Sequence, residues 1–156
     1  MRVARRSVAP APDGYACLVS AAPKVREGNP KMGEEAIGRK ILAAAMKVHT
    51  AIGTGLLESA YEACLAHELR KEGLPLERQI SLPIVYDGEQ LDAGYRLDLW
   101  IERKVIVEIK SVERLLPIHG SQLLSYLRLS NSKLGYLLNF NVVHMKDGIK
   151  RIVNKL

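Results

Sequence analysis

Three ionisable side chains interrupt a stretch of the chain that otherwise has the alternating pattern of a half-buried β-hairpin. Asp98 lies in its first half, and Glu108 and Lys110 lie in its second half, two residues apart. Because successive side chains of a strand point to opposite faces, Glu108 and Lys110 share one face. Carboxylate oxygens are the ligands that hard cations such as Mg²⁺ or Mn²⁺ prefer, so metal binding is the chemistry to test first.

The expected hairpin covers residues 95–112. If a three-residue loop closes on a pair between Ile101 and Val105, antiparallel counting places Asp98 directly opposite Glu108. Directly opposed residues share a face, with Cβ atoms about 5 Å apart. Two carboxylates this close repel each other unless a cation lies between them. The pattern therefore predicts a metal site on this hairpin.

The same alternation predicts the apolar face that points away from the carboxylates. It consists of Tyr95, Leu97, Leu99 and Ile101 on the first strand and Val105, Val107 and Ile109 on the second. A competing interpretation leaves the metal out: Asp98 and Glu108 would each pair with a cation, Arg96 or Lys110, as surface salt bridges that stabilise little.

The length and composition indicate a globular domain preceded by a basic extension. The 156 residues suffice for one domain with a substantial core, and 47% hydrophobic with 26% charged residues is the balance of a soluble protein. Of the net charge of +6, residues 1–33 carry +4, which leaves only +2 for residues 34–156. Any argument for nucleic-acid binding must therefore rest on the site and not on the overall charge.

Residues 1–33 are rich in Ala, Pro, Gly and Arg without a sustained period, and we expect a disordered arm. Two interpretations stay open: translation starts at Met32, or the arm adds phosphate contacts. Cys17 and Cys64 cannot form a disulfide framework or a zinc cluster, which favours a reduced, cytoplasmic setting. No apolar run is long enough to span a membrane, and the prolines after Arg5 and Arg6 break the pattern of an export signal.

Two helices are expected before the hairpin, over residues 34–51 and 56–72. His49 lies at the edge of the first apolar stripe, where a packed or solvent-edge histidine is the simple interpretation. Glu58 lies in the first turn of the second helix, beside Tyr61, and the helix dipole alone favours a glutamate there. An edge strand over residues 76–85, interrupted by Pro83, and a turn at Asp87 and Gly88 complete this half. 

After the hairpin, residues 118–129 have helical spacing, and Gln122 and Tyr126 share one face. Spacing alone makes these two half-buried packing groups and makes His119 a cap or surface group. Residues 134–140 form a compact apolar run, which predicts a buried strand parallel to residues 105–112 through a right-handed crossover. A short final strand over residues 149–153 follows. Its cations, together with one just beyond it, either flank a phosphate path or solvate a sheet edge; they are Lys150, Arg151 and Lys155.

Three segments, which lie in the expected order along the chain, resemble the motifs of a known superfamily. The pattern of Asp98 followed by Glu108-Ile109-Lys110 resembles the core motif of the PD-(D/E)XK nucleases. Residues 55–61, GLLESAY, match the motif for which the GxxExxY family of that superfamily is named. Residues 122–126, QLLSY, resemble the QxxxY motif of its RecB-like members. The match extends over residues 34–154, with Gly-Thr-Gly where family members commonly have Gly-Pro-Gly.

The resemblance implies a restriction-endonuclease-like α/β (α+β) core, with a mixed sheet of about four to five strands flanked by helices, over residues 34–156. It implies a Mg²⁺ or Mn²⁺ ion held by Asp98 and Glu108, with Lys110 acting on the attacking water and Glu58 completing the ligands. The substrate contacts that it implies are Gln122, Tyr126, His49 and Tyr61.

Two functions of different classes follow from the resemblance. The first is a metal-dependent nuclease that hydrolyses phosphodiester bonds of DNA in repair, recombination or defence. The second is a nuclease-like module that binds nucleic acid or a protein partner without cutting. The complete motif set favours the first, whereas the modest charge after residue 33 and the few aromatics favour weak or assisted substrate binding. The pattern does not determine the oligomeric state.

Overall fold

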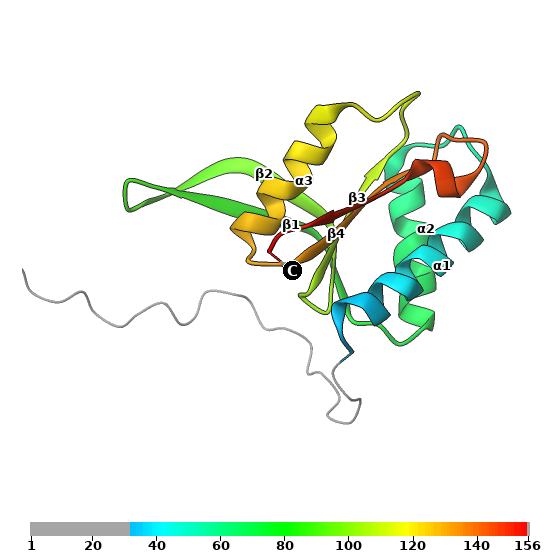
Figure 1. Ribbon diagram of the computed structural model, residues 1–156, viewed down its shortest axis with the longest axis horizontal. Helices are drawn as coiled ribbons and strands as arrows, with labels where there is room; N and C mark the ends of the chain where they lie inside the picture. The colour runs from blue at the N-terminus through cyan, green and yellow to red at the C-terminus, as the bar shows by residue number, and fades with distance from the viewer. Residues whose placement is uncertain (1–31, 156) are drawn as a thin grey trace, which may run out of the picture.

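The computed structural model describes residues 32–155, so the predicted basic arm and Cys17 lie outside the described residues. Figure 1 shows a mixed sheet with helices on both faces. Within the described residues, no helix has the length and apolar character needed to cross a membrane. In chain order the elements are α1 (Glu34–Ile52), α2 (Glu58–Lys71), β1 (Leu76–Tyr86), β2 (Glu89–Ile101), β3 (Val105–Lys110), α3 (Pro117–Leu129), β4 (Leu134–Asn139), the 3₁₀ turn η1 (Met145–Gly148) and β5 (Ile149–Val153).

The sheet has five strands in the order β1-β2-β3-β4-β5, which confirms the expected mixed α/β core. β3 and β4 are parallel and are joined through α3, as predicted, while the other neighbouring pairs are antiparallel. All six residues of β4 and five of the six in β3 are buried. A strand that is buried on both faces carries apolar residues at successive positions, which explains the compact apolar run at residues 134–140.

Two hydrophobic cores lie on opposite faces of the sheet. α1 and α2 pack on one face, and α3 packs on the other (Figure 1). The larger core joins the apolar stripes of α1 and α2 to one face of the central strands, including Ile37, Ile41, Tyr61, Leu65, Leu99, Val107 and Phe140. The smaller core lies under α3 and includes Leu97, Ile106, Leu123, Leu127 and Leu137.

The helix boundaries follow local chemistry with small differences from expectation. Gly53, with a φ of 68°, ends α1 and donates its backbone N–H to the carbonyl of His49. α2 begins at Glu58 and not at residue 56, and Leu57, which precedes the helix, is 78% exposed. α3 begins at Pro117, which is favoured in a first turn because its missing N–H needs no partner there.

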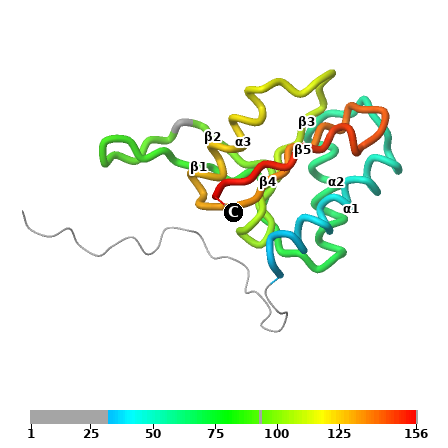
Figure 2. Tube along the Cα trace, in the orientation of Figure 1, coloured from blue at the N-terminus to red at the C-terminus, as the bar shows by residue number. Residues whose placement is uncertain are grey.

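Beyond their pairing with β3, β1 and β2 continue as a two-stranded ribbon that extends away from α1 and α2 (Figure 2). β2 starts at Glu89, six residues earlier than predicted, because the turn at Asp87 and Gly88 joins the two strands directly. Both turn residues have positive φ, as a tight hairpin requires. The predicted irregularity at Pro83 is confirmed: the register shifts between Leu82 and Ile84 on an edge strand.

Substitution of Gly148 by Ala should destabilise the fold by about 1–3 kcal/mol, the usual cost of overpacking. A Cβ at this position would collide with the backbone carbonyl oxygen of Asn139, at the end of β4. Gly33→Ala is the control, since a Cβ there meets nothing within 4 Å. Urea denaturation of both variants measures the difference, and equal free energies of unfolding would contradict the close approach.

Candidate active site

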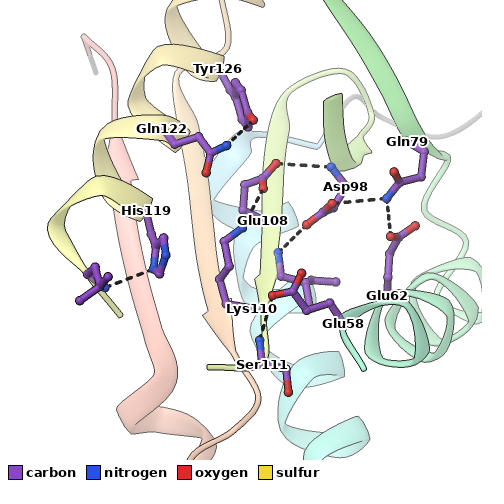
Figure 3. A network of polar contacts seen from close by, with 12 residues as sticks. Glu58, Glu62, Gln79, Asp98, Glu108, Lys110, Ser111, His119, Gln122 and Tyr126 are labelled. Carbon is purple, nitrogen blue, oxygen red and sulfur yellow. Dashed lines mark hydrogen bonds and ion pairs between the residues drawn. The ribbon is translucent and has the colours of Figure 1, made fainter. Parts of the chain in front are cut away.

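β2 and β3 are paired over only three residue pairs and then separate, and the two predicted carboxylates lie where they part. The observed pairs include Ile101 with Val105 and Leu99 with Val107, which is the predicted register and loop. Asp98 and Glu108 are the next residues along the two strands. The structure therefore brings these side chains together at the start of a fork between the strands (Figure 3).

Each carboxylate at the fork accepts a hydrogen bond from the backbone of the opposite strand. The N–H of Ile109 donates to Asp98 Oδ2 at 2.8 Å, and the N–H of Asp98 donates to Glu108 Oε1 at 3.4 Å. Buried backbone N–H groups need partners, and at the fork a neighbouring strand no longer supplies them. The side-chain oxygens take the place of strand carbonyls, which holds both acids between the strands.

The alternation predicted for the first strand is wrong at one point. Leu99 lies in the core under α1 and α2, as expected, but Leu97 lies in the core under α3. Two residues apart on a regular strand would share a face, so β2 changes faces at Asp98. The physical reason is the fork itself: Asp98 directs its carboxylate toward the backbone of β3, and Gln79, opposite it on β1, has a φ of 52°. On β3 the prediction is confirmed for Val105, Val107 and Ile109.

The fork concentrates negative charge in a place that water barely reaches. Glu108 is only 4% exposed, and burial followed by repulsion from Asp98 raises the pKa of its carboxyl to about 8. Burial is also the main cause that raises the pKa of Asp98, with repulsion from Glu62 adding to it. Lys110 partly offsets both effects, and its Nζ lies 3.9 Å from Glu108 Oε2. The half-buried ammonium group does not neutralise the cluster.

Glu58 reaches the end of β3 from the first turn of α2. Its Oε1 accepts a hydrogen bond from the N–H of Ser111 at 3.2 Å, and its charge adds to the repulsion on Glu108. The side chain is exposed, so solvent reaches this carboxylate. The structure thus places Glu58 beside Lys110 and Ser111, on the side of the fork that faces α2 (Figure 3).

A second glutamate of α2, Glu62, borders the fork and was not identified from the sequence. It is 5% exposed and accepts hydrogen bonds from Arg78 Nε at 2.7 Å and Gln79 Nε2 at 2.5 Å. Gln79 Nε2 also lies 3.3 Å from Asp98 Oδ1. One signal was present: Glu62 is four residues after Glu58, so both lie on the same side of the helix.

Gln122 and Tyr126 face the fork from α3, on the other side of the sheet. Gln122 Nε2 donates to the Tyr126 hydroxyl at 2.7 Å, and Tyr126 is 3% exposed. Burial first and then the charge of Glu108 raise the pKa of this phenol. The ring of Tyr95 on β2 meets it edge-on at 5.9 Å. The pair is both a packing group, as spacing alone indicated, and a neighbour of the carboxylates.

Two other candidates, Tyr61 and His49, hold loops in place. The Tyr61 hydroxyl donates to the carbonyl of Gly53 at 2.8 Å and accepts from the N–H of Leu56 at 3.2 Å. His49 Nε2 lies 2.8 Å from the carbonyl oxygen of Val142, in the loop after β4. These contacts support positioning roles, whereas direct substrate contacts by Tyr61 and His49 stay predictions.

His119 accepts a hydrogen bond from the N–H of Leu116 at its Nδ1, 3.2 Å away, which confirms it as a cap of α3. The cap fixes the first turn of the helix that carries Gln122 and Tyr126. Among the cations of the sheet edge, Arg151 pairs with Glu35 and so connects β5 to α1. Lys150 lies beside Gly120 at the start of α3.

The donor set fits a hard cation in its chemistry. Asp98, Glu108 and Glu58 offer only oxygen ligands, and burial followed by repulsion from Asp98 disfavours the charged form of Glu108, which a bound cation would stabilise. Across residues 32–155, however, no three acidic, histidine or cysteine side chains are gathered closely enough to hold an ion in this arrangement. The carboxylates are instead turned toward backbone N–H groups.

Comparison with known proteins agrees with this geometry. Residues 35–152 match the family model described as the PD-(D/E)XK nuclease superfamily. The chain belongs to this superfamily, whose members generally use divalent metals. Searches of the curated proteins and of the solved structures found no match.

Substitution of Glu108 by Gln should stabilise the metal-free protein increasingly as the pH rises. The ordinary pKa of this carboxyl is 4.5, while burial raises it to about 8 in the folded protein. Between these values the folded state keeps a proton that the unfolded state has lost. The stability that Glu108 contributes is therefore present below pH 4.5 and is lost as the pH rises toward 8, at up to about 1.4 kcal/mol per pH unit. Glutamine does not titrate.

Thermal denaturation in EDTA between about pH 5 and about pH 8 measures this effect. The difference in Tm between Glu108→Gln and the wild type should widen over this range. A difference that is independent of pH would show that Glu108 is not held protonated in the fold.

Substitution of Tyr61 by Phe should lower the free energy of unfolding by about 1–3 kcal/mol, because the two hydrogen bonds of its hydroxyl, both part-buried, are lost. The residue is fully buried, and its hydroxyl joins Gly53 to Leu56. Tyr86→Phe, at a residue that is 72% exposed, is the control in the same urea denaturation. Unchanged stability combined with weaker nucleic-acid binding would assign Tyr61 to the substrate instead.

Proposed function

We propose that this chain is a divalent-metal-dependent nuclease of the GxxExxY branch, and that it hydrolyses phosphodiester bonds of DNA. One observation supports the proposal above all others. Asp98 and Glu108 meet at the fork of β2 and β3 with Lys110 beside them, in a chain of the nuclease superfamily. Phosphodiester hydrolysis needs concentrated negative ligands and a nearby cationic side chain, and the fork supplies both.

Asp98 and Glu108 would hold a Mg²⁺ or Mn²⁺ ion, with the carbonyl of Ile109, and with Glu58 directly or through water. Such an ion, when bound, neutralises the scissile phosphate and makes a water molecule a stronger nucleophile at neutral pH. Each carboxylate keeps lone pairs beyond those that accept its present hydrogen bonds, so it would bind the ion with these contacts in place. Loss of the proton from Glu108 accompanies binding, because a protonated carboxyl is a poor ligand.

The remaining side chains act on the water and on the nucleic acid. Lys110 lies at the edge of the carboxylates, where its ammonium group orients the attacking water or stabilises the charge that builds up on the phosphate. The Tyr126 hydroxyl accepts a hydrogen bond from Gln122, so its own hydrogen is left for an acceptor outside this pair. A phosphate oxygen of a bound substrate strand would accept the hydrogen bond from the Tyr126 hydroxyl.

A second candidate is a module that binds nucleic acid or a protein partner without cutting. One observation favours it: both oxygens of Asp98 already accept hydrogen bonds, from Ile109 and Gln79. The net charge of +2 after residue 33 also indicates weak binding by the folded part alone. The cytoplasmic location stays a prediction that rests on cysteine usage.

Purified protein with Mg²⁺ or Mn²⁺ should cleave single- or double-stranded DNA, and EDTA should stop the reaction. Asp98→Asn and Lys110→Ala should each lower the rate by at least about 100-fold, since each removes a charge on which the transition state depends. Asp87→Asn, in the exposed turn of the ribbon, is the matched control and should retain full activity.

The outcomes separate the two candidates. Equal cleavage by the wild type and both site variants would reveal a contaminating nuclease and remove the evidence for catalysis. DNA binding by the wild type without any cleavage in either metal would support the binding module. Mn²⁺ binding that survives the loss of Asp98 would contradict the proposed ligands.

A further inference from the structure

Gln79 joins the buried glutamate of α2 to the aspartate at the fork. Its Nε2 lies 2.5 Å from Glu62 Oε2 and 3.3 Å from Asp98 Oδ1 (Figure 3). We propose that Gln79, anchored by Glu62 and Arg78, is a positioning residue that sets the orientation of the Asp98 carboxylate. This inference deepens the proposed function and rests on it, because orientation matters only if Asp98 binds the metal.

The backbone at Gln79 is shaped to direct its side chain into this place. Its neighbours Arg78 and Ile80 are paired with Leu99 and Leu97 of β2, so Gln79 lies opposite Asp98. Its φ of 52° is in the left-handed region, which side chains with a Cβ rarely adopt. Strained backbone persists where the surrounding contacts require it, and here those contacts are the two carboxylates.

A neutral amide is the group that two neighbouring carboxylates can share. Its –NH₂ carries two hydrogens, one for each acid, and no charge. Because both partners are acceptors, the nitrogen of Gln79 must face them and its oxygen must face away. The amide therefore separates Glu62 from Asp98 while it leaves the charge of Asp98 available for a metal, which a lysine or arginine in its place would cancel.

The charge on Glu62 is balanced elsewhere. Arg78 Nε donates to Glu62 Oε1 at 2.7 Å, and Gln79 Nε2 donates to Glu62 Oε2. Glu62 is thereby a fixed, compensated anchor on α2. Asp98 is then held from both neighbouring strands: β1 supplies the amide of Gln79, and β3 supplies the N–H of Ile109. Loss of either contact leaves the carboxylate free to rotate within the fork.

Gln79→Met tests the proposal, since methionine keeps the length of the side chain and removes both donors. The matched control is Gln90→Met in the exposed part of the same ribbon. Titration calorimetry with Mn²⁺ should show at least about 10-fold weaker binding for Gln79→Met, the usual effect of losing a group that orients a metal ligand. The kcat for DNA should fall by a similar factor with KM unchanged, because nucleic-acid contacts stay intact.

Hydrogen exchange in the metal-free protein tests the positioning role of Gln79 separately from the proposed nuclease activity. In Gln79→Met the backbone amide of Ile109 should exchange its hydrogen at least about 10-fold faster, because Asp98 no longer accepts from it steadily. Glu62→Gln should also weaken Mn²⁺ binding and speed the exchange of the Ile109 amide, each to a smaller extent. This variant replaces Gln79→Met if thermal denaturation shows that Gln79→Met does not fold.

Exchange rates and Mn²⁺ affinities equal to those of Gln90→Met would overturn the inference. So would faster exchange with unchanged Mn²⁺ affinity, because the orientation would then not matter for the ligand. If the wild type itself neither binds Mn²⁺ nor cleaves DNA, the proposed function fails. The exchange of Ile109 then decides alone whether Gln79 positions Asp98.

Discussion

The separation of β2 from β3 is the constraint on which the rest of this structure depends. Where two strands part, their backbone N–H groups lose strand partners, and in a buried region water does not replace them. Asp98 and Glu108 supply oxygen atoms at that point, each to the opposite strand. The same two hydrogen bonds therefore join the separating strands and bring the two carboxyl groups close together.

Burial of these acids explains the groups that surround them. Two carboxylates in a poorly solvated place either take up a proton or recruit positive and hydrogen-bonding partners. Lys110 from β3 stabilises the charged form of both acids, and the amide of Gln79 from β1 and the N–H of Ile109 stabilise that of Asp98. Burial and then repulsion from Asp98 still raise the pKa of Glu108. The remaining imbalance is what a divalent cation would relieve, which connects the electrostatics of the fold to the proposed hydrolysis.

The loops around the fork are fixed by buried polar side chains. Tyr61 ties the segment before α2 to the end of α1, so that Glu58 reaches the end of β3. Asn139 pairs through its side chain with both backbone groups of Val112, which extends the β3–β4 pairing beyond the last strand residue. Both residues act on the site through backbone position, and neither needs to touch a substrate.

The sequence alone predicted the hairpin register and the meeting of Asp98 with Glu108, and its family resemblance implied the mixed sheet, with about four to five strands. Period-two alternation and a loop of three residues leave only one pairing that buries Val105, Val107 and Ile109. The parallel β4 followed equally from an apolar run after a helix. These features depend on local periodicity and on connection length, both of which can be read along the chain.

Only the tertiary structure decided which further side chains surround Asp98 and Glu108 at the fork. The change of face at Asp98, the left-handed Gln79 and the buried Glu62 arise because β1, β2 and α2 pack against one another at the point where β3 departs. No spacing in the sequence encodes that contact, since its members lie 17 to 36 residues apart. Strand alternation predicts faces for an ideal strand, and it takes no account of the contacts that β1, β2 and α2 make through Gln79, Asp98 and Glu62.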